Sequence, residues 1–222
     1  MTEMEPVKMW NEAKQESPLN YFHDTSSGNS SKSSYPNAST KAKSSLVAKE
    51  QHICSHLNLR GDPRDAVFQN IVSKILGISL PVRPGHYNRI VSENDLMSLY
   101  WLGPDEWLLI SQQSAEQLSE TLNAHISTTD VSGGQTLLNL SGDKDAIQIV
   151  LKKSSVYDFG VWEPASDSGG RCVQTTFGKT SALVSNKSNG SYDLVIRRSF
   201  ADYFALWLLD AGREFGVSIV SY

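Results

Sequence analysis

The phrase LNLSGD at residues 138–143 decides the fold, because nearly the same phrase, LNLRGD, stands at residues 57–62. The copies lie 81 residues apart (138 − 57) and differ at one letter. Each alternates leucines as a half-buried strand does, and then reaches a Gly-Asp pair that is typical of a helix start. Runs with helical spacing follow at 62–76 and 143–153. We interpret the phrases as equivalent strand-to-helix turns of a duplicated chain.

The first copy opens a half with two predicted helices. In the first helix Val67, Ile71 and Ile75 recur every four residues, with Phe68 and Val72 beside them, which predicts one buried face. Pro63 suits the first helical position. A proline-rich connector at 81–85 follows this helix. The expected elements are, in order, a strand at 53–59, the helix at 62–76, strands at 97–102 and 107–110, a helix opened by a capping box at 114–117 and a strand at 129–132.

The second copy opens a half with the same order and one extra hairpin strand. Its last helix has capping-box spacing at 199–202, large apolar residues from Phe200 to Phe215 on one side, and Gly216 at its end. The expected elements are a strand at 136–140, a helix at 143–153, strands at 171–177, 180–185 and 192–197, the helix from 199 and a strand at 217–222.

The order β-α-β-β-α-β in each half is that of the ferredoxin-like split unit, whose helices cover one face of a mostly antiparallel sheet. We therefore predict an α+β fold built from duplicated ferredoxin-like units. The body spans 46–222, with half-repeats at about 52–132 and 134–222. The other face of each sheet must be covered by its twin or by another protein.

Residues 1–45 are expected to form a separate N-terminal arm. Ser, Asn and Lys crowd the stretch from 17 to 45, which shows no sustained apolar period, so the arm should be flexible by itself. Trp10, Leu19, Tyr21 and Phe22 nevertheless punctuate it. Two interpretations stay open: a disordered tail with incidental aromatic residues, or an arm that becomes ordered on the surface of a partner.

Composition excludes several classes of protein. The 222 residues carry a net charge of −4, which provides no basic surface for nucleic acid. No apolar run approaches the roughly 20 residues of a membrane span, and Met1 to Trp10 lacks the apolar core of a signal peptide. Cys54 and Cys172 are too few for a disulfide scaffold. We expect buried free thiols in a cytoplasmic protein without membrane contact.

Three groups of residues are candidates for chemistry, and each has a simpler explanation. His52 and His56 are four apart with Cys54 between them, but in a strand this spacing does not converge on a metal. The turn Ser132-Gly133-Gly134 could bind an anion or merely join the halves. Arg197 and Arg198 precede the predicted helix start at Ser199, where they could hold an anion, be solvated or form a salt bridge.

Five motifs resemble the gamma subunit family of heterotetrameric sarcosine oxidase. They are LNLRGD at 57–62, WLGPDEWL at 101–108, DVS at 130–132, GRCVQT at 170–175 and RSFADY at 198–203. The resemblance runs from about Ser17 to the C-terminus. The chain departs from the family in a long Ser-rich insertion between Leu19 and Ser45, and in Gly133, where the family often has His.

The resemblance implies a subunit of an oxidoreductase acting on CH–NH donors with oxygen. That complex demethylates sarcosine to glycine, makes hydrogen peroxide and passes the one-carbon unit to tetrahydrofolate. FAD, FMN, NAD and tetrahydrofolate are expected in the partner subunits. Partners would be the alpha, beta and delta subunits, with docking mainly on alpha. No catalytic, cofactor-binding or metal-binding residue of the family maps onto this chain, so none is assigned.

The family is also similar to the folate-binding domain of the glycine cleavage T-protein, which is likewise built from duplicated units. An alternative function is therefore an independent folate-binding or one-carbon-transfer module. Such a module would need a carboxylate poised in a pocket to hold or activate the pterin, and no residue pattern predicts one. The non-catalytic subunit is the favoured hypothesis.

Overall fold

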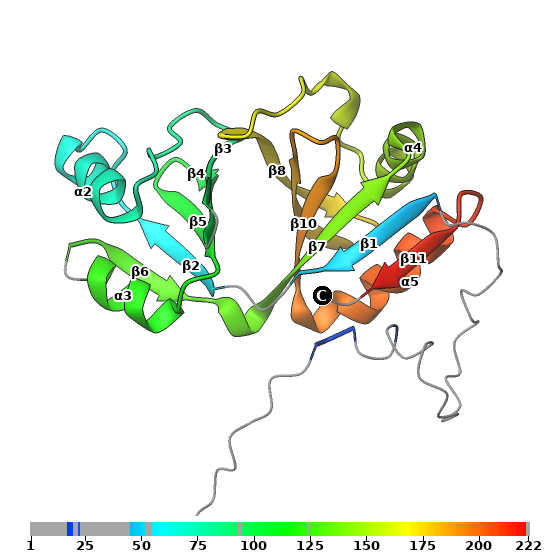
Figure 1. Ribbon diagram of the computed structural model, residues 1–222, viewed down its shortest axis with the longest axis horizontal. Coiled ribbons are helices and arrows are strands. Elements are labelled where there is room, and N and C mark those ends of the chain that lie inside the picture. The colour runs from blue at the N-terminus through cyan, green and yellow to red at the C-terminus, as the bar shows by residue number, and fades with distance from the viewer. Residues whose placement is uncertain are drawn as a thin grey trace, which may run out of the picture.

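The computed structural model describes residues 17–19, 22, 45–51, 55–92, 95–123 and 125–220. The strands within these ranges form one sheet of eleven, in the order β11-β1-β7-β10-β9-β8-β3-β4-β5-β2-β6. The sheet bends into two half-sheets that face each other, and the helices lie on their outer sides (Figure 1). Among the described residues, no helix is long and apolar enough to span a bilayer.

The first half contains five strands and two helices. Its elements are β2 (Ser55–Arg60), α2 (Ala66–Leu76), β3 (His86–Ser92), β4 (Asp95–Gly103), β5 (Glu106–Ser111), α3 (Ala115–Asn123) and β6 (Ser127–Asp130). Strand β3 was not predicted. Its sequence, HYNRIVS, mixes polar and apolar residues on both faces, so the period-2 pattern is weak.

The second half follows from a 3-10 turn, η1 (Ser132–Gly134). Its elements are β7 (Gln135–Gly142), α4 (Lys144–Ser154), η2 (Phe159–Val161), β8 (Gly169–Phe177), β9 (Thr180–Asn186), β10 (Tyr192–Arg197), η3 (Arg198–Phe200), α5 (Ala201–Ala211) and β11 (Val217–Val220). With β3 included, both halves read β-α-β-β-β-α-β, so the strand that looked extra is common to both. The duplicated α+β fold with a mostly antiparallel sheet is confirmed.

Equivalent strands join the two halves. Strands β3 and β8 pair antiparallel, with Tyr87 opposite Gly170. From this seam the order is β3-β4-β5-β2 in one direction and β8-β9-β10-β7 in the other. Because each strand sits at the same distance from the seam as its counterpart, the halves are related by a pseudo-two-fold arrangement.

Strand β1 (Leu46–Glu50) breaks this equivalence. It precedes both predicted half-repeats in sequence, yet it lies in the second half-sheet, antiparallel to β7 and parallel to β11. In the first half β6 pairs directly with β2. The predicted ranges 52–132 and 134–222 therefore leave out a strand that belongs to the second half-sheet. Its five residues were too few for a recognisable pattern.

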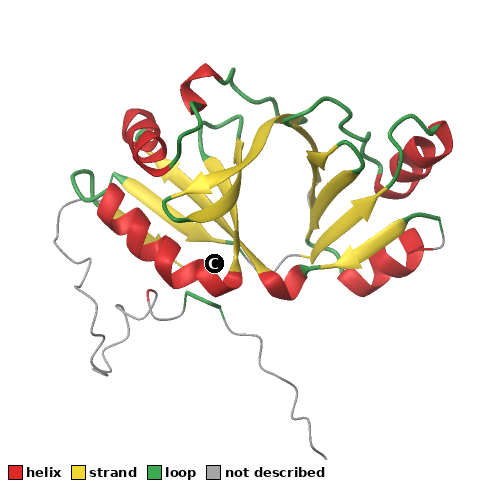
Figure 2. Ribbon diagram, turned by 180° about the vertical axis from the view of Figure 1, so that it is seen from behind, coloured by secondary structure: helices red, strands yellow, loops and turns green. Residues whose placement is uncertain are grey.

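Three groups of buried side chains hold the fold together. One lies between the first half-sheet and helices α2 and α3, and includes Trp107. Another lies between the second half-sheet and helices α4 and α5, and includes Phe204. The third lies between the half-sheets and draws Tyr87 and Tyr100 from the first half, and Leu137 and Leu183 from the second. Each half-sheet thus covers the inner face of its twin, while helices cover the outer faces (Figure 2).

The repeated phrase forms a strand-to-helix turn in both halves, as predicted, but the helices start differently. Asp143 is the N-cap of α4, and its carboxylate accepts a hydrogen bond from the Ala146 N–H at 2.9 Å. Helix α2 begins four residues later than predicted, at Ala66, and Asp65 is its N-cap. The predictions that Asp62 starts this helix and that Pro63 is its first residue are therefore wrong.

Two further helix predictions are tested by the structure. The buried face of α2 includes Phe68 and Val72, as predicted, and Ile71 and Ile75 pack against the same core, but Val67 is 64% exposed, so its predicted burial is wrong. Helix α5 begins at Ala201 after η3, without a side-chain cap, so the predicted capping box at 199–202 does not form. This helix ends at Ala211 rather than at Gly216.

The predicted flexibility of residues 1–45 lies outside the described residues, except at Ser17–Leu19, Phe22 and Ser45. These few pack on the body. Leu19 is fully buried in the core of the second half, and Phe22 packs against the same core. Trp10 and Tyr21, the other apolar residues singled out in the arm, are not among the described residues.

Candidate functional site

One member of the predicted histidine pair, His56, lies among the described residues. His56 is buried at the start of β2, and its Nδ1 lies 2.8 Å from Oε1 of Gln135. Burial lowers the pKa of His56, which keeps the ring neutral, although the Gln135 contact opposes that shift. His52 and Cys54 lie outside the described residues. Within the described ranges, no three His, Cys, Asp or Glu residues are grouped as metal ligands.

The glycine turn between the halves is explained by its own hydrogen bonds. The Ser132 N–H donates to the Asp130 carboxylate at 2.9 Å, and the Ser132 hydroxyl accepts from the His56 N–H at 2.9 Å. Gly134 donates its N–H to the Val131 carbonyl. The Asp130 carboxylate thus accepts from the Ser132 N–H, one of the groups that an external anion would use, and the turn joins β6 to β7.

The predicted arginine pair does not meet a helix start. Arg197 ends β10 and Arg198 begins η3, whereas α5 starts only at Ala201. The interposed 3-10 turn separates both arginines from the free N–H groups of the helix. Turn η3 lies against η1, so the structure brings together two motifs that are far apart in the sequence.

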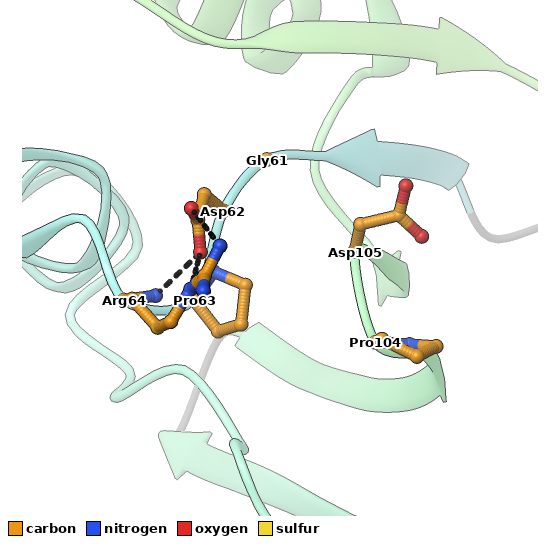
Figure 3. A pocket seen from close by; sticks show the side chains of 6 residues that line it. All are labelled: Gly61, Asp62, Pro63, Arg64, Pro104 and Asp105. Atoms are coloured by element: carbon orange, nitrogen blue, oxygen red, sulfur yellow. Dashed lines mark hydrogen bonds and ion pairs between the residues drawn. The ribbon is translucent and has the colours of Figure 1, made fainter.

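An open depression of about 600 Å³ lies beside the repeated phrase of the first half. It is formed by the turn from β2 to α2 and by the turn between β4 and β5 (Figure 3). Its lining residues are Gly61, Asp62, Pro63, Arg64, Pro104 and Asp105. The two turns are joined by a hydrogen bond from the Gly61 N–H to the Asp105 carbonyl at 3.2 Å.

The charges in this depression are paired and exposed. Arg64 donates to both carboxylate oxygens of Asp62, at 3.1 and 3.0 Å, and these hydrogen bonds lower the pKa of Asp62. Arg60 reaches Asp105 at 3.5 Å and Glu106 at 3.0 Å. The lining holds no nucleophile beside a base, and solvent screens its ion pairs.

A buried ionic cluster between the half-sheets was not anticipated from the sequence. The ammonium of Lys187 lies 2.6 Å from the Asp193 carboxylate, and these side chains are only 6% and 11% exposed. The same ammonium lies 4.8 Å from the ring centre of Tyr87 and 5.8 Å from that of Tyr100. Both rings belong to the first half, so this cation–π contact ties the halves together.

The repeated phrase takes part in this cluster. Asn139 donates to the Asp193 carboxylate at 2.7 Å, and in the first half Asn58 donates to the Glu106 carboxylate at 2.6 Å. In each half, therefore, the asparagine amide donates a hydrogen bond to a carboxylate that also pairs with a cation. The repeated phrase was the one feature of the sequence that could have indicated this cluster, because Tyr87 and Lys187 lie 100 residues apart (187 − 87).

The two half-sheets share a cluster of buried, mostly apolar side chains. Its members include Tyr87, Tyr100, Leu108, Ile110, Leu137 and Val195, each at most 5% exposed. The depression in Figure 3 exposes the carboxylates of Asp62 and Asp105, which disfavour a phosphate. Cys172 is inert, because burial raises the pKa of its thiol to about 12.

Relatives of this chain are found by sequence and by fold. The profile of the sarcosine oxidase, gamma subunit family matches residues 60–214. Sarcosine oxidase subunit gamma of Corynebacterium sp. (strain U-96) is 26% identical over 189 residues, which cover 83% of this chain and 87% of the relative. Its counterpart in Arthrobacter sp. is 26% identical over 180 residues, covering 79% and 84%.

Two solved structures share the fold. A chain of the heterotetrameric sarcosine oxidase from Corynebacterium sp. U-96, in complex with pyrrole 2-carboxylate, superposes with a TM-score of 0.71 at 23% identity, covering 91% of this chain and 96% of that one. The glycine cleavage system aminomethyltransferase T from Bartonella henselae superposes with a TM-score of 0.54 at 13% identity, covering 80% and 48%.

The fold and the filled seam define a class: a duplicated, ferredoxin-like α+β protein with the architecture seen in aminomethyltransferase T. Within that class the sequence is specific, since the family profile covers 155 residues (214 − 60 + 1) of the 222. The chain belongs to the sarcosine oxidase gamma subunit family.

Proposed function

We propose that this chain is the non-catalytic gamma subunit of a heterotetrameric sarcosine oxidase. The carrying observation is its match to gamma subunits along 83% of its own length and 87% of theirs. The family resemblance implies a complex that oxidises sarcosine with oxygen and transfers the one-carbon unit to tetrahydrofolate. The products would be glycine, hydrogen peroxide and 5,10-methylenetetrahydrofolate.

The chain itself contributes no catalytic, cofactor-binding or metal-binding residue in this proposal. FAD, FMN, NAD and tetrahydrofolate belong to the partner subunits. The side chains that fill the seam support this division, since a pterin could enter only by displacing buried tyrosines and leucines. That filling also disfavours the alternative of an independent folate-binding or one-carbon-transfer module.

Assembly with alpha, beta and delta subunits, mainly through alpha, is the role that remains. An obligate interface of this kind buries on the order of 2,000 Å² or more. Exposed apolar side chains could supply its centre: Val156 is 94% exposed, Val161 70% and Phe200 45%. We place the assembly in the cytoplasm, in keeping with the free thiol of Cys172.

Co-expression of the four subunits, with and without this chain, tests the proposal. We expect the complete set to co-purify and to consume oxygen when sarcosine is added, and the set without this chain to assemble poorly. A chain that stays monomeric beside the alpha subunit in sedimentation would contradict the assignment. Visible absorbance tests the division of labour, because flavin released stoichiometrically from the isolated chain would place a cofactor here.

A further inference from the structure

The sequence of the second half-repeat does not supply every strand of its own half-sheet. Strand β11 does not pair with β7, because β1 lies between them over Leu46–Lys49. Leu46 and Ala48 point into the core of the second half, and both are fully buried. The first half needs no such strand, since its own β6 pairs with β2.

A second piece from the N-terminal side closes the same core. Leu19 is fully buried in the hydrophobic core of the second half, and Phe22 packs against the same core. The Phe22 N–H donates to the Leu19 carbonyl at 2.8 Å, so the two side chains are held by one short turn. Because Leu19 has no exposed surface, removing it would leave a cavity or open the core to water.

Polar contacts fasten this turn to the end of β1. The Ser17 hydroxyl donates to the Glu50 carboxylate and accepts from the Leu19 N–H at 2.9 Å. Thr136 of β7 donates to the other oxygen of Glu50 at 3.1 Å. Glu50 is only 2% exposed, so the loss of these donors would leave a buried carboxylate with fewer partners, which is costly.

We propose that strand β1, together with the turn at Ser17–Leu19 and Phe22, acts as a donor segment that completes the second half. Strand β1 fills the slot between β7 and β11, and the turn at Ser17, Leu19 and Phe22 seals the core below it. The segment is held by side-chain packing and hydrogen bonds, not merely by its covalent link to β2. It therefore stays bound when the link between Gln51 and Ser55 is cut.

This inference changes the role of the arm. Leu19 and Phe22 are occupied inside the chain, so they are not anchors for a partner subunit. If the arm contributes to subunit assembly, as the proposed function allows, that contribution comes from residues outside the donor turn. Loss of the donor segment affects the stability of the isolated chain, whereas loss of a partner contact affects assembly alone.

The test uses the full chain with a protease recognition sequence inserted between Gln51 and Ser55. After cleavage of the folded protein, we expect the N-terminal fragment to co-elute with the body in gel filtration and to separate only in denaturant. Leu19→Ala should weaken rebinding of the labelled fragment on the order of 100-fold. Leu206→Ala, at a leucine of α5 that is 36% exposed, is the matched control and should change it less than about threefold.

Hydrogen exchange of the chain without the inserted protease sequence gives a second measurement, which does not depend on the insertion. Leu19→Ala should speed exchange in β1 and β11 while leaving β4 and β5 unchanged. A fragment that separates from the cleaved body without denaturant would overturn the proposal. Equal effects of Leu19→Ala and Leu206→Ala, or a dimer that exchanges fragments between copies, would do so as well.

Discussion

The two halves use the same repeated phrase in different surroundings. Asn58 and Asn139 each hold an acid that pairs with a cation, but Arg60 and Glu106 are 51% and 28% exposed, whereas Lys187 and Asp193 are 6% and 11% exposed. The second cluster faces the tyrosines of the other half, while the first faces solvent. Both copies thus have the same hydrogen-bond pattern, but their different burial decides how much each ion pair contributes to the free energy of unfolding.

The largest effect is expected from a substitution that breaks the buried ion pair of the second half. Lys187→Met leaves Asp193 charged and buried, so we expect the free energy of unfolding to fall by about 3–5 kcal/mol. Arg60→Met removes the exposed counterpart and should cost about 0–1 kcal/mol. Urea denaturation of both variants measures the difference. Adding Asp193→Asn to Lys187→Met should restore part of the loss, and equal costs for the two single variants would refute the comparison.

The glycines of the phrase provide the next contrast. Gly142 has φ +131°, and an added Cβ would lie 2.0 Å from the Ser45 carbonyl oxygen, so alanine must displace the backbone that leads into β1. At Gly61 the added Cβ would meet the Phe68 ring at 2.5 Å, and a ring can move. We expect Gly142→Ala to cost about 3 kcal/mol or more and Gly61→Ala about 1–2 kcal/mol. Thermal and urea unfolding together check this order.

The aspartates of the phrase should differ by a smaller amount. Asp143→Ala removes the N-cap of α4 and should cost about 1 kcal/mol. Asp62→Ala removes an exposed ion pair with Arg64 and one hydrogen bond from the Arg64 backbone N–H, and it should stay within about 0.5 kcal/mol, because Asp65 caps α2. Asp65→Ala is the matched variant and should behave like Asp143→Ala. A larger loss at Asp62 than at Asp65 would contradict the observed helix start.

The smallest effect is a pH dependence at the junction of the halves. Since burial lowers the pKa of His56 in the folded state, the unfolded chain binds more protons near and below the ordinary value of 6.5. The contribution of this ring to stability is therefore present above that pH and is lost as the pH falls through it. His56→Gln should flatten this part of the stability curve relative to the unsubstituted chain. Urea midpoints between pH 5 and 8 would show the difference.

Local patterns predicted most of the elements correctly, and their failures have definite causes. Helix α4 has a 3.6-residue period, and strands β9 and β10 are short, mostly apolar runs bounded by turn residues, so they were found nearly at their observed bounds. Strand β1 is too short to show a period, and β3 is too mixed. The start of α2 was misplaced because Asp62 and Asp65 are both acceptable caps in sequence.

The candidate site was less predictable than the fold. Nothing local distinguishes Lys187 from an exposed turn lysine, because its burial depends on Tyr87 and Tyr100 from the other half. The turn from 132 to 134 and the arginines at 197 and 198 were noticed in the sequence. The role of the turn depended on its hydrogen bonds to Asp130 and His56, and that of the arginines on where α5 begins. Such contacts arise from chain segments that meet only after folding.

The sequence by itself determined the duplication, the α+β class and the family, because the repeated phrase and the residue periods are written locally along the chain. The tertiary structure alone decided which half owns β1, where Leu19 is buried and which of the two asparagine clusters is shielded from water. These outcomes depend on pairing between distant strands and on burial, and a residue acquires both only from neighbours that are remote in sequence.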